Sequence, residues 1–469
     1  MLDINSWRDV ETFNSSDESE YSDSTVDTDS DFDLYLSSET ESEEQNTIVA
    51  PPSSQTGASN VGGIWTAAIR PPSTTSFCGN QGPTPQSAVT NINSPYDYFK
   101  LIFDDDLMNL LVEETNLYAT QFMEQHDPLP SSRVTAWVPT NKGELEVFLG
   151  LNILTGLVQK AGKLESYWSK DPLLSTPYFR QCMSRNRFQL LNKLLHFNNN
   201  QQRPSNCTDK LYKVRPVYDR IIGRWRELYN PGEHIAIDEG MLKWRGRLSF
   251  RVYMKSKPVK YGIKSYILAD SQNHYCWNLE VYHRSKKTIL ETIEGLLTEE
   301  LCGLWHTLYT DNFYSSVKLS EFLLAKNIHT VGTLRNHRGE PPEITSLRKM
   351  KRHKKLSRDN GKVLILAWKH KRIVKVISTK HDNSSLPITR RVKGGGGNME
   401  TIMKPSVIVD YNKHIVGRRP SQPNACVLSF HTKVREMDEE TFLLFDEHYH
   451  AQQFCIVQFA WRCYYNELF

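Results

Sequence analysis

The chain has 469 residues, with 57 Lys plus Arg against 54 Asp plus Glu and a formal net charge of +3. Hydrophobic residues make up 39% and aromatic residues 11%, which excludes a wholly disordered or collagen-like chain and leaves material for two or three domains. No apolar run reaches the ~18 residues that a membrane helix needs. The eight cysteines include no CxxC pair. We therefore expect neither a membrane protein nor a zinc site.

The near-neutral charge is the sum of two unlike parts. Residues 1–50 hold 15 Asp plus Glu and one basic residue, Arg8, which gives −14; the remaining 56 basic and 39 acidic residues give +17. We interpret residues 1–94 as a disordered acidic tail and linker, because they contain too little apolar surface to offset the entropy of ordering. Serines in the tail precede acidic residues, so an acidophilic kinase is a candidate partner.

The first folded part is predicted to be helical. Asp104 is a candidate N-cap for a helix that should end before Asp127-Pro128, and Thr140 is a candidate N-cap for the next. Apolar residues at helical spacing predict two more helices at about 184–197 and 216–229. Residues 95–230 are therefore predicted to form an all-helical region.

After residue 230 the pattern becomes that of an α/β fold. A short apolar run ends at Asp238, and runs typical of strands follow at 249–254, 261–269 and 275–283. A helix at 287–300 precedes a short strand that ends at Asp311, and a further helix and strand are predicted at 314–326 and 328–334. This order of elements indicates an RNase H-like sheet over residues 231–335.

Asp238 and Asp311 are the candidate catalytic and metal-binding residues. Each follows an apolar strand, and the ends of neighbouring strands hold ligands rigidly while leaving them accessible to solvent. Carboxylates suit Mg²⁺, which supports phosphodiester chemistry by activating a nucleophile and stabilising the leaving oxygen. The alternative is that either aspartate caps a turn or a helix.

A strongly basic stretch lies between these two acids. Residues 241–264 contain no acidic residue and eight basic ones, which are predicted to bind DNA phosphates: Lys243, Arg245, Arg247, Arg251, Lys255, Lys257, Lys260 and Lys264. Trp244, Phe250, Tyr253 and Tyr261 are interleaved among them and could stack on bases or pack the sheet. The alternative is the solvated face of a hairpin.

A second basic cluster spans 348–358 and contains seven basic residues in eleven. Such a cluster is typical of a nuclear localisation signal, of a DNA-binding patch, or of both. The residues that we assign to the signal are Arg348, Lys349, Lys351, Arg352, Lys354 and Lys355. Together with the reduced cysteines that the spacing indicates, this cluster predicts a nuclear protein.

These segments together resemble the piggyBac transposase family, including its domesticated piggyBac-derived relatives. The similarity runs from about Tyr96 to Ile415. Its most specific parts are IDEGMLKWRGRLSFRVYMKSKPVKYGIK (237–264) and LYTDNFYSSVKL (308–319), supported by AWKHKRIVKVISTKHD (367–382) and KPSVIVDYNKHI (404–415).

The resemblance implies an RNase H-like catalytic domain with an inserted subdomain, here the basic segment 336–403, and helical regions for dimerisation and DNA-end binding. It implies cut-and-paste transposition through DNA hairpins at TTAA targets with a divalent metal, so Mg²⁺ is the expected cofactor if the protein is active. Double-stranded DNA and a second copy of the chain are the implied partners. Asp238 and Asp311 correspond to the first and second catalytic acids.

The third acid of the family is missing from the aligned position. The similarity stops after Ile415, and counting without gaps places Arg419 at the catalytic position and Gln422 at the acid that follows. A guanidinium stays protonated and would repel Mg²⁺. Residues 404–469 are therefore predicted to be a divergent C-terminal segment that completes or replaces the core helices.

Three functional hypotheses follow. The preferred one is a transposase-derived DNA-binding protein without strand-cleavage activity. The second is an active metal-dependent transposase or nuclease in which another acid substitutes, the candidates being Asp438, Glu439, Glu440, Asp446 and Glu447. The third is a protein-interaction module that uses the acidic tail, with the basic body inherited from the transposase.

Overall fold

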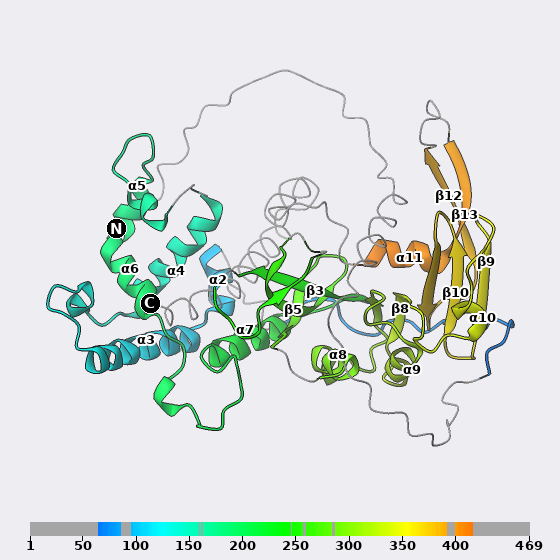
Figure 1. Ribbon diagram of the computed structural model, residues 1–469, viewed down its shortest axis with the longest axis horizontal. Coiled ribbons are helices and arrows are strands. Elements are labelled where there is room, and N and C mark those ends of the chain that lie inside the picture. The colour runs from blue at the N-terminus through cyan, green and yellow to red at the C-terminus, as the bar shows by residue number, and fades with distance from the viewer. Residues whose placement is uncertain are drawn as a thin grey trace.

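The computed structural model describes residues 64–85, 95–158, 160, 163–244, 246–255, 257, 259–283, 287–391 and 399–415. The predictions for the acidic tail and for Arg419 lie outside these residues. The described chain is elongated, with helices gathered at one end and a long sheet running through the rest of the molecule (Figure 1). Within these ranges no helix combines the length and apolar character that crossing a bilayer requires.

The helical end confirms the predicted periodicity and one of the two predicted caps. Asp104 caps its helix by accepting a hydrogen bond from the Leu107 amide at 2.9 Å. The cap of the next helix is Asn141 rather than Thr140, whose buried hydroxyl donates to Glu144. The α-helices are α2 (Pro95–Ile102), α3 (Asp105–His126), α4 (Lys142–Leu157), α5 (Pro177–Cys182), α6 (Arg185–Leu194) and α7 (Arg215–Leu228), with 3₁₀ turns at Arg133–Ala136, Leu164–Trp168 and Asn200–Gln202.

The centre of the sheet has the strand order β6-β5-β3-β7-β8. The pairs β6-β5 and β5-β3 are antiparallel, whereas β3-β7 and β7-β8 are parallel, which is the arrangement of an RNase H-like sheet. Two helices, α8 (Ile289–Leu297) and α9 (Val317–Ala325), connect these strands, and a 3₁₀ turn lies at Glu299–Leu301. The strands are β3 (His234–Lys243), β5 (Tyr261–Asp270), β6 (Cys276–Val281), β7 (Thr307–Thr310) and β8 (His329–Thr333).

Three antiparallel strands extend this sheet beyond β8 in the order β11-β10-β9. They are β11 (Ile373–Ser378), β10 (Leu364–Lys369) and β9 (Lys355–Asp359), and β11 pairs with β8 through Val376 and Thr333. The segment predicted as an inserted subdomain thus continues the central sheet through β11, β10 and β9. A separate ribbon contains β12 (Ser385–Arg391) and β13 (Met399–Pro405), and α10 (Pro342–Thr345) precedes β9.

The two faces of the sheet are buried by different elements. Ile235, Ile237 and Leu308 belong to a large core that also contains residues of α3, α4, α7 and α8, so the helical end and the sheet share one core. On the opposite face, Ala236 and Tyr309 pack against α11 (Ser406–His414). This division follows from the alternation of side chains along each strand.

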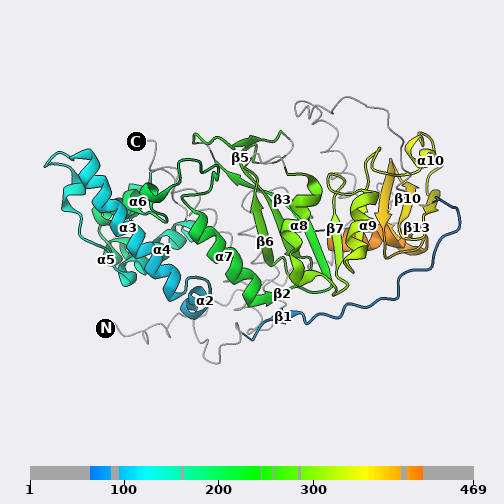
Figure 2. The same ribbon diagram turned by 90° about the horizontal axis from the view of Figure 1, so that it is seen from below.

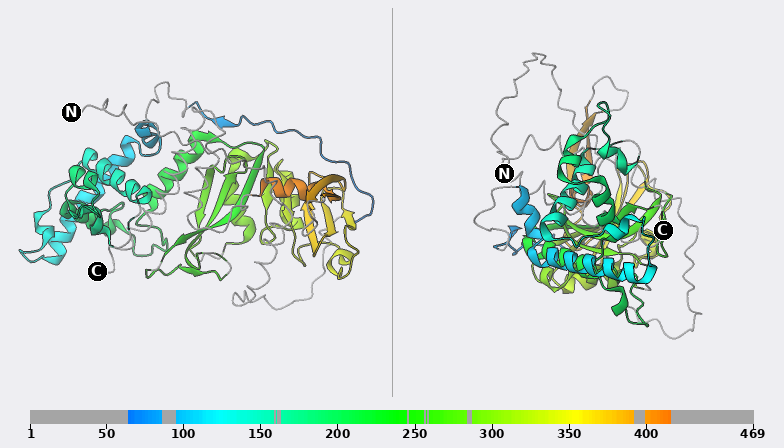
Figure 3. Two further views of the ribbon diagram at one scale, coloured as in Figure 1. Left: turned by 90° about the horizontal axis from the view of Figure 1, so that it is seen from above. Right: turned by 90° about the vertical axis from the view of Figure 1, so that its left-hand side faces the viewer.

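An extended strap, residues 64–85, runs along the sheet (Figures 2 and 3). Thr66 pairs with Asp359 at the outer edge of β9, and Gly82–Pro83 (β1) pairs with Tyr229–Asn230 (β2) at the other end. Between these points the Ser73 amide donates to the Lys380 carbonyl at 2.7 Å. The prediction of a linker up to residue 94 is therefore wrong for this stretch, because backbone pairing with the folded body orders a sequence that has no periodicity of its own.

Candidate active site

The structure brings Asp238 and Asp311 together on neighbouring strands. Ile237 on β3 is in register with Thr310 on β7, so the two aspartates follow at the same level of a parallel pair. In-register side chains on adjacent strands point to the same face, here the face covered by α11. The side chain of Asp238 is 26% exposed, and Asp311 is 6% exposed.

The sequence placed Asp238 at the end of a strand, and this detail is wrong. Strand β3 continues to Lys243, but beyond Ile237 it pairs only with β5. Residues Glu239–Lys243 and Gly262–Tyr266 therefore form an arm that extends past the acids. Strand β6 borders its base through Ser265 and Tyr266, and the two-residue strand β4 (Val252–Tyr253) pairs onto its outer part. The basic stretch of the sequence is largely this arm.

Asp238 is a carboxylate with little compensation for its burial. The Glu239 amide donates to its Oδ1 at 2.7 Å, and the Lys257 Nζ lies 3.9 Å from the same atom. Burial raises the pKa of Asp238 to about 6, and the neighbouring carboxylate of Glu239 adds to this effect, while Lys257 opposes it. Its charged form would be stabilised by a further cation.

The adjacent Glu239 is occupied by a different lysine. Its carboxylate forms a 3.1 Å ion pair with Lys264, and both side chains are about one-tenth exposed, at 9% and 11%. The Lys264 Nζ lies 4.8 Å from the centre of the Tyr266 ring and 5.0 Å from that of Phe313. Lys264 was predicted to contact DNA, but the structure places it inside the protein.

A tyrosine lies close to these carboxylates. Burial, together with the negative charges of Glu239, Asp311 and Asp238 in that order, raises the pKa of Tyr314 well above its ordinary value. The residue is 1% exposed, and its hydroxyl has no hydrogen-bond partner among the residues that the structure describes. Tyr314 belongs to the large core on the face of the sheet away from α11, and sequence patterns had not singled it out.

The other predicted DNA-binding residues differ in exposure. Lys243, Arg247, Lys255 and Lys260 are exposed, whereas Arg251 and Lys257 are half-buried and Arg245 lies outside the described residues. The interleaved aromatic residues also divide: Trp244 and Phe250 are core residues, while Tyr253 and Tyr261 are 53% and 52% exposed and lie 4.6 Å apart. The arm therefore presents both cations and aromatic rings to solvent.

The second basic cluster lies at the opposite end of the sheet. Its six assigned residues are all exposed and occupy the connection between α10 and β9 together with the first residue of β9. Strand β9 is the last strand on that side, whereas β4 and β5 lie on the other. The structure does not bring the two basic clusters together.

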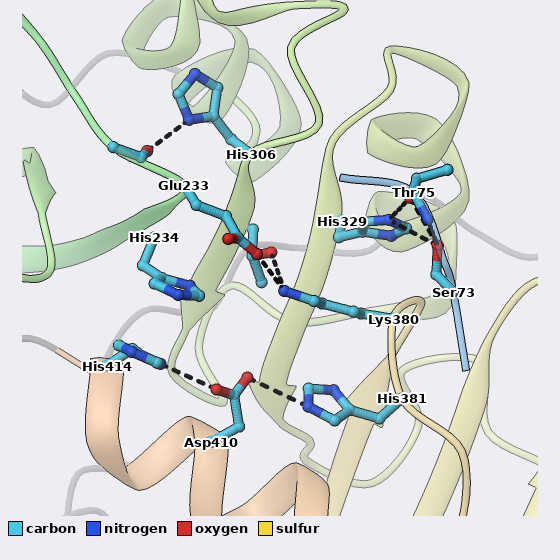
Figure 4. A network of polar contacts seen from close by, with 12 residues as sticks. Ser73, Thr75, Glu233, His234, His306, His329, Lys380, His381, Asp410 and His414 are labelled. Atoms are coloured by element: carbon cyan, nitrogen blue, oxygen red, sulfur yellow. Dashed lines mark hydrogen bonds and ion pairs between the residues drawn. The ribbon is translucent and has the colours of Figure 1, made fainter. Parts of the chain in front are cut away.

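A network around Asp410 on α11 was also missed by sequence reasoning (Figure 4). Asp410 accepts hydrogen bonds from Tyr309 Oη at 2.7 Å and His414 Nδ1 at 3.0 Å, and His381 Nε2 lies 3.3 Å away. Burial alone would raise the pKa of Asp410, but these three donors hold it well below its ordinary value. Only the spacing of Asp410 and His414 on one helix could have indicated this network from the sequence.

The Asp410 network also determines which hydrogen-bonding role His234 Nδ1 takes. Because the Tyr309 hydroxyl gives its proton to Asp410, its oxygen must accept from His234 Nδ1, which lies 3.1 Å away. His234 stacks on His414 at a ring separation of 3.8 Å, and burial and the proximity of His414 lower the pKa of His234 to about 4. Asp410 is thus satisfied by protein groups and is not available to a ligand.

Asp238 and Asp311 fit part of a Mg²⁺ site. Mg²⁺ is commonly bound by one or two carboxylates and several waters. The Lys257 Nζ lies 3.9 Å from Asp238 Oδ1, and burial outweighs its effect on the pKa of that carboxyl. Across the described ranges, no group of three His, Cys, Asp or Glu side chains is arranged to hold a metal ion, so a third protein carboxylate is not supplied there.

Comparisons with known proteins relate the chain to transposases. A sequence profile of the protein family described as "Transposase IS4" matches residues 94–425. PiggyBac transposable element-derived protein 2 of Homo sapiens is 23% identical over 364 residues, which cover 73% of this chain and 58% of the relative. PiggyBac transposable element-derived protein 3 of Homo sapiens is 24% identical over 348 residues, covering 71% and 56% respectively.

A solved structure is also similar. It is the cryo-EM structure of a piggyBac transposase synaptic complex with hairpin DNA, with a TM-score of 0.62, 26% identity, and coverage of 82% of this chain and 78% of that one. The chain spans less than two thirds of the length of the two human relatives.

Proposed function

Because this chain belongs to the piggyBac family of DDE transposases, we propose that it is a transposase-derived DNA-binding protein that does not cleave DNA strands. One observation carries the proposal: the site has two carboxylates, which follow in-register residues of neighbouring strands. The acid on the covering helix, Asp410, is already bound by three protein groups, those of Tyr309, His381 and His414. In the sequence, the position aligned with the third acid is Arg419. A guanidinium cannot replace a carboxylate as a metal ligand.

The missing acid affects catalysis more than binding. The family generally uses divalent metal ions, which would activate a nucleophile and stabilise the leaving oxygen. Asp238 and Asp311, which follow in-register residues of β3 and β7, would hold such an ion together with waters. With two ligands the ion is bound weakly and its position is poorly determined, so strand cleavage is not expected.

DNA binding is assigned to the arm that extends past the acids. Lys243, Lys255 and Lys260 are exposed on it, and the Tyr253 and Tyr261 rings are exposed on the same arm. Lysines contact phosphates of any sequence, and exposed rings can stack on unpaired bases. The similar solved protein is in a complex with hairpin DNA, which supports the assignment.

Duplex binding measured at several salt concentrations tests the binding half of the proposal. The triple variant K243Q/K255Q/K260Q should bind less tightly, with a slope of log affinity against log salt that is smaller by about 2 to 3. The matched control, K349Q/K351Q/K354Q, removes the same charge at the opposite end of the sheet and should leave the slope nearly unchanged. Equal effects of both variants would contradict the assignment to the arm.

Incubation with a labelled DNA end flanked by TTAA, in the presence of Mg²⁺ or Mn²⁺, tests the catalytic half. We expect no nicking by the purified full chain. Metal-dependent nicking that disappears in Asp238→Ala would overturn the proposal and favour the active transposase, since only an acid outside the described residues could then complete the site.

Nuclear localisation is proposed from the exposed cluster at 348–355. All six of its assigned cations are available on the surface. Replacing Lys349, Lys351 and Lys354 by Gln in a fluorescent fusion should shift the protein toward the cytoplasm, while the K243Q/K255Q/K260Q control should not.

A further inference from the structure

The basic loop, residues 348–355, is a surface of concentrated positive charge. It carries six exposed cations in eight residues and no acidic residue. No Asp or Glu of the described chain forms an ion pair with these six side chains. The acidic residues nearby in sequence are engaged elsewhere: Glu343 pairs with Arg358, and Asp359 lies 3.6 Å from Arg70. Within the described part of the fold, the basic loop therefore forms no ion pair with an acidic side chain, although the charge of Asp382 acts on Lys355.

The strap begins at the same edge of the sheet. Thr66 and Asp359 exchange backbone hydrogen bonds of 2.9 and 3.1 Å, and Trp65 packs on the apolar cluster that includes Leu347 and Met350 at the base of the basic loop. Both views place the start of the strap beside α10 (Figures 1 and 2). Four residues of β9 separate Asp359 from Lys355, which corresponds to about 13 Å.

The chain that precedes the strap has the complementary charge. Residues 11–44, which we call the acidic segment, contain 13 Asp plus Glu and no Lys or Arg. Residues 45–63 contain no charged residue and are rich in Ser, Gly, Pro and Thr. A connection of 19 residues can span at most about 63 Å when fully extended, which exceeds the distance from the strap to the basic loop.

We propose that the acidic segment binds the basic loop of the same chain. The fold brings the point of attachment to this surface, the uncharged connection is long enough to reach it, and the two charges are opposite. The DNA-binding arm is a poorer site for the segment, because six strand spacings separate β5 from β9, about 29 Å. A short tether raises the effective concentration of the segment at the nearer site.

Such binding must be sensitive to salt, because it rests on exposed ion pairs that are individually weak and screened within about 10 Å at 0.1 M ionic strength. It would cover the loop that we assign to nuclear import, and it would keep DNA phosphates from this end of the sheet. The inference does not depend on the proposed DNA binding, since it concerns two parts of one chain.

Carbodiimide crosslinking of the purified full chain at low salt, followed by mass spectrometry, tests the proposal without DNA. Most crosslinks from the acidic segment should end on Lys349, Lys351 and Lys354, and they should disappear at high salt. In K349Q/K351Q/K354Q they should be lost, whereas in K243Q/K255Q/K260Q they should persist. Crosslinks distributed equally between the loop and the arm, or their absence from the loop, would overturn the proposal.

A mixture of isotopically labelled and unlabelled chains distinguishes binding within one chain from binding between two. We expect crosslinked peptides that carry a single label state. Peptides of mixed label, at a frequency that rises with concentration, would show that the acidic segment binds another copy and would contradict the proposal. The two outcomes are unaffected by whether the arm binds DNA.

Discussion

Asp238 and Asp410 lie on the same face of one sheet and are similarly exposed, at 26% and 21% of their side-chain surfaces. Their pKa values are nevertheless shifted in opposite directions. The pKa of Asp238 rises to about 6, and that of Asp410 is held well below its ordinary value. The difference lies in the partners: Asp238 accepts one backbone amide and has an ammonium at 3.9 Å, whereas Asp410 has Tyr309, His381 and His414 around it.

This contrast separates a carboxylate held for a ligand from one used by the fold. A carboxyl group with a shifted pKa and few hydrogen-bond partners, on a strand of the central sheet, is a common sign of a functional position. A carboxylate that is fully hydrogen-bonded is instead part of the structure, because removing it leaves buried donors without partners. The two aspartates should therefore respond to substitution with opposite signs.

The largest effect is expected for Asp410→Ala. Its loss leaves three donors without their acceptor, so the free energy of unfolding at pH 7 should fall by about 2 to 4 kcal/mol. Urea denaturation followed by tryptophan fluorescence measures this change, with Lys413→Ala on the same helix as the control. Because the folded-state pKa is lowered, the stabilisation should be present above pH ~4 and should be lost as the pH falls below it. Equal stability of the two variants would contradict the structural role.

His234 should produce the next largest effect, which appears as a pH dependence. Its pKa is about 4 in the fold and 6.5 in the reference state, so between these values the unfolded chain binds a proton that the folded chain does not. Stability should rise with pH through this window, by about 1 to 2 kcal/mol for a half-buried group. His234→Phe retains a ring against His414 and should flatten the rise. An unchanged slope would show that another group is responsible.

Asp238→Asn should have a smaller effect of the opposite sign to that of Asp410→Ala. The folded-state pKa lies above the reference value of 3.8, so the folded chain holds a proton more tightly than the unfolded chain. The free energy of unfolding should therefore fall as the pH rises from about 4 through about 6 and Asp238 ionises. The amide avoids this cost, and we expect a gain of about 1 kcal/mol at pH 7 after allowing for solvent screening. The gain should vanish below pH 4. A loss of stability at pH 7 would place Asp238 with Asp410 as a structural residue.

The smallest effect is expected from metal ions. If Asp238 and Asp311 hold a divalent ion weakly, Mn²⁺ at a concentration near its dissociation constant should stabilise the fold by about 0.4 kcal/mol. The shift in the urea midpoint should be absent in Asp238→Asn and retained in Lys413→Ala. A shift that persists without Asp238 would mean that the ion binds elsewhere.

Much of the fold could be predicted from local patterns. The cap at Asp104, the periodicity of α3, α6 and α7, and the strands around Asp238 and Asp311 are visible in the sequence because they depend on residues close along the chain. The strap could not be predicted, because its order comes from hydrogen bonds to residues such as Asp359, which lies 293 positions away from Thr66. The continuation of β3 past Asp238 was missed because the arm is polar and basic rather than apolar.

The site shows the same division. Composition and spacing alone establish that two aspartates follow short apolar runs, that a basic stretch lies between them, and that the tail is acidic. Three other properties come from the packing of distant segments: Lys264 is enclosed with Glu239, Asp410 is satisfied by residues from β7, α11 and the turn after β11, and the basic loop lies near the start of the strap. These properties depend on distances and burial between segments remote in sequence, which set whether a charge is solvated, paired or free to bind.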